Sequence, residues 1–286
     1  MALHNRRPNF LLTTVLAVVL GLVIAALGLL PWNILAQLNM RWGPNVPWCA
    51  PVGLLWLFLF WSYLNGRGWP ASTAQRRNKL LRALPLHGKT LRWCAFAGAI
   101  GLVALVTLYF VAIQFVDLPP SVFRPRSVAA LPFGVAVVAM FMSAVVAGVV
   151  EEAAYRGYMQ GILERRFGAP VAIAIVTIVF TGVHLVGGSK ILPLAIPVCA
   201  TGVVLGTLTV ITRSVLPAMV VHVLADTTTL PVEWGLVGQL PVGRFYRNGV
   251  DAAFAGVMLV LLLAWAAVIA ALLKLRTIAK DTQAEA

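Results

Sequence analysis

Eight long apolar runs that carry almost no charge decide what this chain can fold into. A run of about 20 apolar residues can cross the hydrocarbon core of a bilayer, and in lipid the backbone must satisfy its own hydrogen bonds as a helix. The predicted fold class is therefore all-α, a polytopic membrane helix bundle with about eight transmembrane helices. The expected spans are residues 10–30, 46–64, 93–116, 128–150, 170–186, 191–212, 214–230 and 252–273.

The composition excludes a soluble globular domain. Hydrophobic residues make up 60% of the chain and charged residues only 11%, whereas soluble domains keep about 25% charged residues. The net charge of +13 would suggest nucleic acid in a soluble protein. Here the cations lie between apolar runs, so the predicted partners are membrane lipids with anionic headgroups at the cytoplasmic face, and no nucleic acid.

The distribution of basic residues predicts the orientation. Eight crossings place most of the 22 Lys and Arg residues on the side of the N terminus. The exceptions are Arg41, Arg124, Arg126, Lys190, Arg244 and Arg247. Because basic loops stay in the cytoplasm, we expect a multi-pass protein of the cell membrane with both termini cytoplasmic. We expect three parts: three N-terminal helices with a basic cytoplasmic loop (1–127), a membrane core that holds the candidate site described below (128–230), and a final helix with a cytoplasmic tail (231–286).

Few ionisable side chains fall within the membrane helices. Of the nine acidic residues, Glu151, Glu152 and Asp226 lie inside or at the inner end of a predicted span, and so do two of the four histidines, His184 and His222. An ionisable side chain is costly in a bilayer, so each of these residues is a candidate for a functional site.

Helix geometry separates the two adjacent glutamates. Glu152 and Arg156 are i and i+4, the spacing and order that favour an ion pair, while Glu151 points about 100° away and is predicted to stay free. A turn at residues 165–170 should make an antiparallel hairpin, in which Glu151 and His184 are equally far from the turn and therefore level. His222 and Asp226 are also i and i+4 and share one helix face.

One carboxylate, two imidazoles and a further acid in an apolar bundle suit acid and base catalysis on water, so hydrolysis is the simplest reaction. No cofactor is expected on this interpretation. The alternative is zinc, since Glu151, His184 and His222 would supply a His2Glu set, although the sequence HExxH is absent.

Three motifs together resemble one family. They are EExxxR at Glu151, Glu152 and Arg156, FxxxH at Phe180 and His184, and HxxxD at His222 and Asp226. In this order, on the fourth, fifth and seventh helices, they are similar to the CAAX protease and bacteriocin-processing (CPBP) family of intramembrane proteases, whose best-known members are the Ras-converting CAAX prenyl endopeptidases.

The resemblance implies a role for each matching residue. Glu151 would activate a water with help from His184, while His222 and the residue four positions later would stabilise the oxyanion; Glu152, Arg156 and Phe180 would support them. Relatives often carry asparagine where this chain has Asp226. Since an ionised aspartate would repel an oxyanion, we hypothesise that Asp226 favours a protonated His222, which is then the donor.

The predicted function is hydrolysis of a peptide bond near the cytoplasmic side by a water that a glutamate activates. The substrate would be a peptide or protein, and lipidated and membrane-bound substrates both fit. Two further classes stay open: a non-catalytic scaffold or immunity protein that binds peptides without cutting them, and a small proton-coupled transporter.

Overall fold

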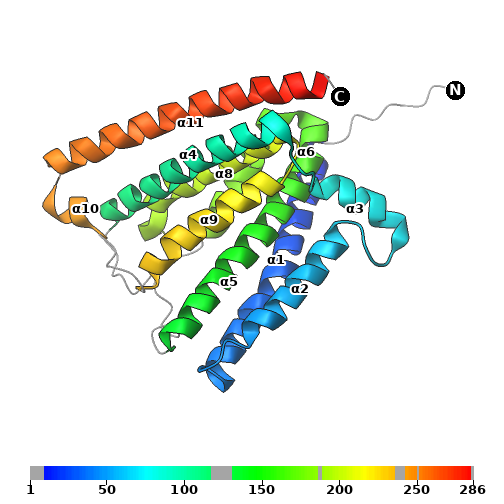
Figure 1. Ribbon diagram of the computed structural model, residues 1–286, viewed down its shortest axis with the longest axis horizontal. Coiled ribbons are helices and arrows are strands. Elements are labelled where there is room, and N and C mark those ends of the chain that lie inside the picture. Colours follow the sequence, from blue (N-terminus) through cyan, green and yellow to red (C-terminus); the bar gives the residue numbers. More distant parts are fainter. Residues whose placement is uncertain (1–9, 117–130, 186–188, 236–241, 250, 285–286) are drawn as a thin grey trace.

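The computed structural model is a helical bundle (Figure 1). It describes residues 10–116, 131–185, 189–235, 242–249 and 251–284, and this part of the chain contains no strand. Val128 and Val186, which bound two expected spans, and Arg124 and Arg126 lie outside the described residues. The helices are α1 (Phe10–Trp42), α2 (Cys49–Leu64), α3 (Ala74–Leu81), α4 (Gly88–Ala112), α5 (Phe133–Glu151), α6 (Gln160–Phe167), α7 (Ala169–His184), α8 (Ala195–Thr212), α9 (Leu216–Glu233), α10 (Arg244–Asn248) and α11 (Ala252–Ala284).

The predicted all-α membrane bundle is confirmed, and each expected span coincides with one helix. Five helical segments are long and apolar enough to cross a membrane: Phe10–Trp42, Gly88–Phe115, Phe133–Phe167, Leu192–Thr212 and Ala252–Thr282. Two shorter apolar helices, α2 and α7, accompany them. The eighth, α9, carries His222, Asp226 and three consecutive threonines, and these polar residues lower its hydropathy.

One helical rod runs without a break from Phe133 to Phe167. Its middle, Glu152–Met159, is a π-helix, in which each amide bonds to a carbonyl five residues earlier. The apolar pattern predicted that the helix would continue through this stretch but not that it would change type. All eight residues of the π-helix are buried. Segments of π-helix occur often at functional sites, and this one begins directly after Glu151.

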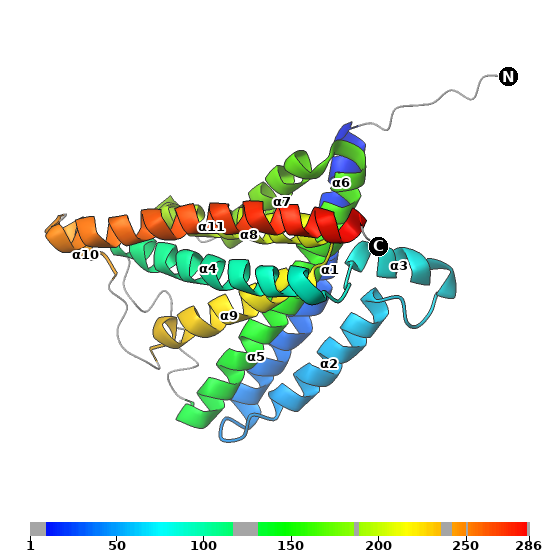
Figure 2. The same ribbon diagram turned by 45° about the horizontal axis from the view of Figure 1, so that its top comes forward.

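The helices pack in two groups that do not follow their order in the chain. In Figures 1 and 2, α1, α2 and α5 are inclined to α4, α8 and α11, which run side by side. One apolar core joins α1, α2, α5, the π-helix and α7, and a second joins α4, α8, α9 and α11. The helix α9 contributes to both, with Met219 in the first core and Val221 in the second.

The two ends of the bundle differ in charge. In Figure 2, α3, α6 and the end of α11 lie at one end, and we call this the basic end. Away from this end the helices diverge in Figure 2: α1 and α2 meet at the bottom of the view, α9 ends at the lower left and α11 starts at the far left, and we call these helix ends together the opposite end. The basic end contains Arg67, Arg76, Arg77, Lys79, Arg82, Lys89, Arg92, Arg165, Arg166, Arg213, Lys274, Arg276 and Lys280.

Candidate active site

A buried ionic cluster joins the π-helix to α9. Arg156 Nη1 donates to Oε1 of Glu152 over 2.7 Å, and both side chains are fully buried. Oε1 also lies 2.8 Å from Nδ1 of His222, 70 residues further along the chain. The sequence predicted the pair between Glu152 and Arg156, but it did not indicate that this glutamate also holds His222.

A glycine on α5 allows α9 to come this close. A Cβ added at Gly148 would lie 2.5 Å from Cγ2 and 3.0 Å from the backbone N of Val223. Since Gly148 lies one turn before the two glutamates and Val223 follows His222, this contact brings the imidazole to the carboxylates. The small residue therefore determines the distance between the two helices that carry the site.

Glu151 faces both histidines. Its Oε2 lies 3.8 Å from Nε2 of His184 and 4.0 Å from Nε2 of His222. This oxygen is buried and has no hydrogen-bond partner among the described residues. The structure thus brings together Glu151, His184 and His222 at nearly one depth, as the hairpin geometry predicts for the first two.

Phe180 organises its neighbours through its backbone and its ring. Its carbonyl oxygen lies 2.8 Å from Nδ1 of His184. A carbonyl only accepts, so Nδ1 carries the proton and the Nε2 of a neutral ring is left as an acceptor toward Glu151. The phenyl ring lies 4.4 Å from the ring of His184, and Arg156 Cζ lies 4.3 Å from its centroid, a cation–π contact.

Asp226 is close to His222 but not hydrogen-bonded to it. Its Oδ2 lies 3.7 Å from Nε2 of His222, and 29% of its side chain is exposed. The sequence analysis paired the two residues because they share a helix face. In the structure the hydrogen-bonded acid of His222 is Glu152, because Nδ1 faces the π-helix while Nε2 faces Glu151 and Asp226.

The exposed side of the site faces a cavity of about 320 Å³. Phe180, His184, His222 and Asp226 line it, with Tyr109 on α4 and Glu233 on α9. The sequence analysis ended the seventh span at Leu230, whereas α9 continues through Pro231 to Glu233. Extending the helical period would have found this acid, because Asp226, Thr229 and Glu233 are i, i+3 and i+7.

The cavity extends away from the basic end. Its residues on α4 lie in the last third of that helix, those on α8 lie in the first half, and those on α9 run from His222 to Glu233. Cleavage near the cytoplasmic side, which the sequence analysis expected, stays a prediction.

The loop after α3 contacts the two elements that carry the ionic cluster, the π-helix and the start of α9. The Arg82 guanidinium bonds the backbone oxygen of Arg156 and pairs with Glu164. The backbone oxygen of Arg82 accepts from the amide of Val215, at the start of α9, over 3.0 Å, and Ser214 Oγ donates to the oxygen of Leu84 over 2.6 Å. No local pattern in the sequence pointed to these contacts.

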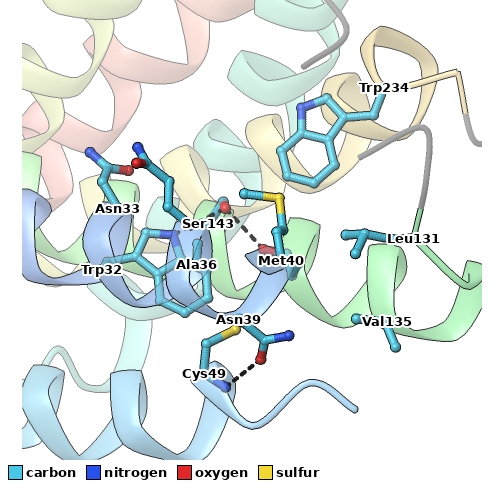
Figure 3. A pocket seen from close by; sticks show the side chains of 12 residues that line it. Trp32, Asn33, Ala36, Asn39, Met40, Cys49, Leu131, Val135, Ser143 and Trp234 are labelled. Atoms are coloured by element: carbon cyan, nitrogen blue, oxygen red, sulfur yellow. Dashed lines mark hydrogen bonds between the residues drawn. The ribbon is translucent and has the colours of Figure 1, made fainter. Parts of the chain in front are cut away.

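A second cavity, of about 290 Å³, lies beside α1 and α5 near the opposite end (Figure 3). Trp32 Nε1 donates to Ser143 Oγ over 3.1 Å, and Asn39 Oδ1 accepts from the amide of Cys49 over 2.8 Å. These bonds join α1 to α5 and α2, so these polar groups serve packing.

Within the described ranges, no group of three or more His, Cys, Asp or Glu side chains has the arrangement of a metal site. In the suggested zinc set, Glu151 faces Nε2 of both histidines, and the Nδ1 of His222 is bonded to Glu152. Zinc binding by Glu151, His184 and His222 stays a prediction that only metal analysis tests.

Comparison with known families gives a match to part of the chain. Residues 132–228 match the family described as Rce1-like, type II CAAX prenyl endopeptidase. The match covers about a third of the chain and includes every predicted site residue from Glu151 to Asp226. It supports the CAAX protease family, as the three motifs indicated. No curated protein and no solved structure matches this chain.

Proposed function

We propose, from the match of residues 132–228 to the Rce1-like family, that this chain is an intramembrane endopeptidase in which Glu151 activates the attacking water. The observation that carries the proposal is the position of Glu151 Oε2, buried and unbonded among described residues, 3.8 Å and 4.0 Å from two imidazole nitrogens. A general base needs a free lone pair near the proton that it accepts.

His184 complements this base. With its Nδ1 proton donated to the carbonyl of Phe180, its Nε2 is an acceptor, and the carboxylate of Glu151 is a second acceptor opposite it. A water between the two donates one proton toward each, which orients its lone pair toward a substrate carbonyl. Glu151 takes the proton as the oxygen attacks, and the same proton can then pass to the leaving amine.

His222 supplies the charge that the transition state needs. Its Nδ1 donates to a carboxylate that Arg156 already holds in place, so the ring is fixed and its Nε2 faces Glu151 and Asp226. In the imidazolium form, Nε2–H can donate to the oxyanion of the tetrahedral intermediate. A donor that is fixed before the reaction costs no reorganisation, which makes such stabilisation effective.

Peptide or protein substrates follow from the family match. The cavity wall is mainly apolar and includes Leu105, Val106 and Val198. It suits apolar side chains of an extended peptide, and lipidated and membrane-bound peptides both stay candidates. Anionic lipids at the basic end, the cell membrane as location and cytoplasmic termini belong to the same proposal.

The test is cleavage of a peptide library by the purified protein in proteoliposomes, with new peptide termini identified by mass spectrometry. Glu151→Gln and His184→Ala should lower turnover by about 10²-fold or more, the usual contribution of a general base. The matched controls are Asp281→Asn and His87→Ala, both at exposed positions. Full turnover in folded Glu151→Gln protein would refute the mechanism, and peptide binding without any new termini would favour the non-catalytic scaffold.

A further inference from the structure

We infer that the loop between α2 and α3, together with α3, binds the headgroups of anionic phospholipids. The binding surface, which we call the lipid anchor, consists of four exposed residues: Arg67, Trp69, Arg76 and Lys79. The inference gives a definite surface to the anionic lipids proposed at the basic end. It does not depend on the protease chemistry, so the two can be tested separately.

A buried arginine fixes the path of this loop. Arg77 Nε donates to the backbone oxygen of Tyr63 over 2.8 Å, and its Nη1 donates to that of Pro70 over 3.1 Å. Its Nη2 donates to the backbone oxygens of the two residues before Trp69, over 3.0 Å and 3.1 Å. One guanidinium therefore bonds the backbone on both sides of Trp69, and the indole is carried by a backbone that is held in place.

The loop follows directly from a helix that faces lipid. On α2, the side chains of Leu55, Phe58 and Leu59 are each more than half exposed, so in a bilayer they contact acyl chains. The helix ends at Leu64, and Trp69 follows five residues later. In Figure 2 the loop and α3 lie at the edge of the bundle, beside this end of α2.

The exposure of Trp69 suits the boundary between lipid and water. Its side chain is 87% exposed, the largest fraction among the large hydrophobic residues that the structure describes. Tryptophan is enriched at the level of the headgroups, because its ring is apolar while its N–H can still reach polar partners. An indole that follows the last turn of a lipid-facing helix is therefore placed at this level.

The positive charge of the lipid anchor has no acidic counterpart in the protein. Residues 1–116 contain no Asp or Glu, and among the described residues no acid forms an ion pair with the three cations of the anchor. On the neighbouring α6, Glu164 is already paired with Arg82. The charges of Arg76 and Arg82 also act on Arg165. Clustered cations beside a membrane attract its anionic lipids.

The combination of charge and indole favours a lipid over a free anion. A phosphate ion in solution would interact with the cations alone. A phospholipid also offers the boundary of its acyl chains, where the exposed indole loses its contact with water. The anchor therefore fits an acidic phospholipid, whose headgroup meets the cations while the indole lies beside the acyl chains.

The experiment measures which lipids contact the purified full-length protein in nanodiscs of phosphatidylcholine. The probes are spin-labelled phosphatidylglycerol and spin-labelled phosphatidylcholine, and the readout is the immobilised fraction of each. The test variant carries Arg67→Gln, Arg76→Gln and Lys79→Gln. The matched control removes the same charge from exposed positions of α11 at the basic end, and it carries Lys274→Gln, Arg276→Gln and Lys280→Gln.

We expect the preference for phosphatidylglycerol to fall by about tenfold in the test variant, because each basic residue at a membrane surface adds to the attraction. The fall in the control should be much smaller. An equal fall in both variants, or no fall in the test variant, would overturn the inference. Neither measurement needs catalysis, so added Glu151→Gln should change nothing, and a failed cleavage assay would leave the lipid anchor standing.

A second measurement locates the loop and needs none of the charge substitutions. Cys49 and Cys94 are buried and Cys199 is exposed, so a Cys199→Ser background carries Trp69→Cys labelled with bimane. Quenching by a lipid with a nitroxide on its headgroup should exceed quenching by iodide in the water. Stronger quenching by iodide would place the loop outside the headgroup region and would overturn the inference as well.

Discussion

Glu152 Oε1 lies 2.8 Å from Nδ1 of His222, although the two residues are 70 positions apart in the chain. The same oxygen accepts from Arg156 over 2.7 Å. One buried carboxylate thus fixes an imidazole and compensates a buried guanidinium. In the proposed mechanism, the second glutamate of the motif is therefore a positioning residue, while the first is the base.

The first prediction compares the two acids near His222. Glu152→Gln should lower kcat by about tenfold to hundredfold, the usual effect of losing a partner that orients a functional imidazole. Asp226→Asn should have a smaller effect, because Oδ2 of Asp226 lies 3.7 Å from the ring and is not bonded to it. Steady-state cleavage by both variants checks this, with thermal unfolding as the control for folding. A larger loss in Asp226→Asn would return the positioning role to Asp226.

The second prediction concerns the approach of α9 to α5. Gly148→Ala should lower activity by about 10²-fold, because a displacement of about 1 Å in a catalytic arrangement has an effect of that size. The added methyl would clash with Val223, whose backbone N lies only 3.0 Å from the new Cβ. Gly256→Ala on α11 is the control, since nothing lies within 4 Å of its Cβ. Equal activity in the two variants would contradict the proposed role of the glycine.

The third prediction concerns Arg82, which contacts the backbone of the π-helix and the start of α9. We expect Arg82→Gln to reduce kcat by about tenfold, with KM little changed, because the loop positions Glu152 relative to His222 and does not touch the cavity. Glu164→Gln removes the ion pair of Arg82 but keeps its bond to the carbonyl of Arg156, so it should have a smaller effect. If both variants lost the same activity, the ion pair alone would explain the result.

The fourth prediction tests the zinc alternative. We expect purified protein to retain its activity after treatment with a chelator, because base, acceptor and donor are all side chains in the proposed mechanism. Elemental analysis should give well under one zinc per chain. Activity that is lost with a chelator and restored by stoichiometric zinc would instead support metal binding by Glu151, His184 and His222.

Local features of the sequence predicted most of the fold. The length of each apolar run fixed the positions of the eight spans, because only a helix of about 20 residues satisfies the backbone across a bilayer. The i, i+4 rule distinguished the paired Glu152 from Glu151 for the same local reason. These properties depend on a single helix, so the chain encodes them without reference to its neighbours.

Other features depend on which helices meet, and only the tertiary structure decided them. The sequence gives no sign that Glu152 bonds His222, that Arg82 contacts the π-helix, or that α4 packs along α11. Periodicity identifies the polar face of a helix but not the partner of that face. The cavity between α4, α7, α8 and α9 likewise follows from packing, because its volume depends on the space that side chains leave empty.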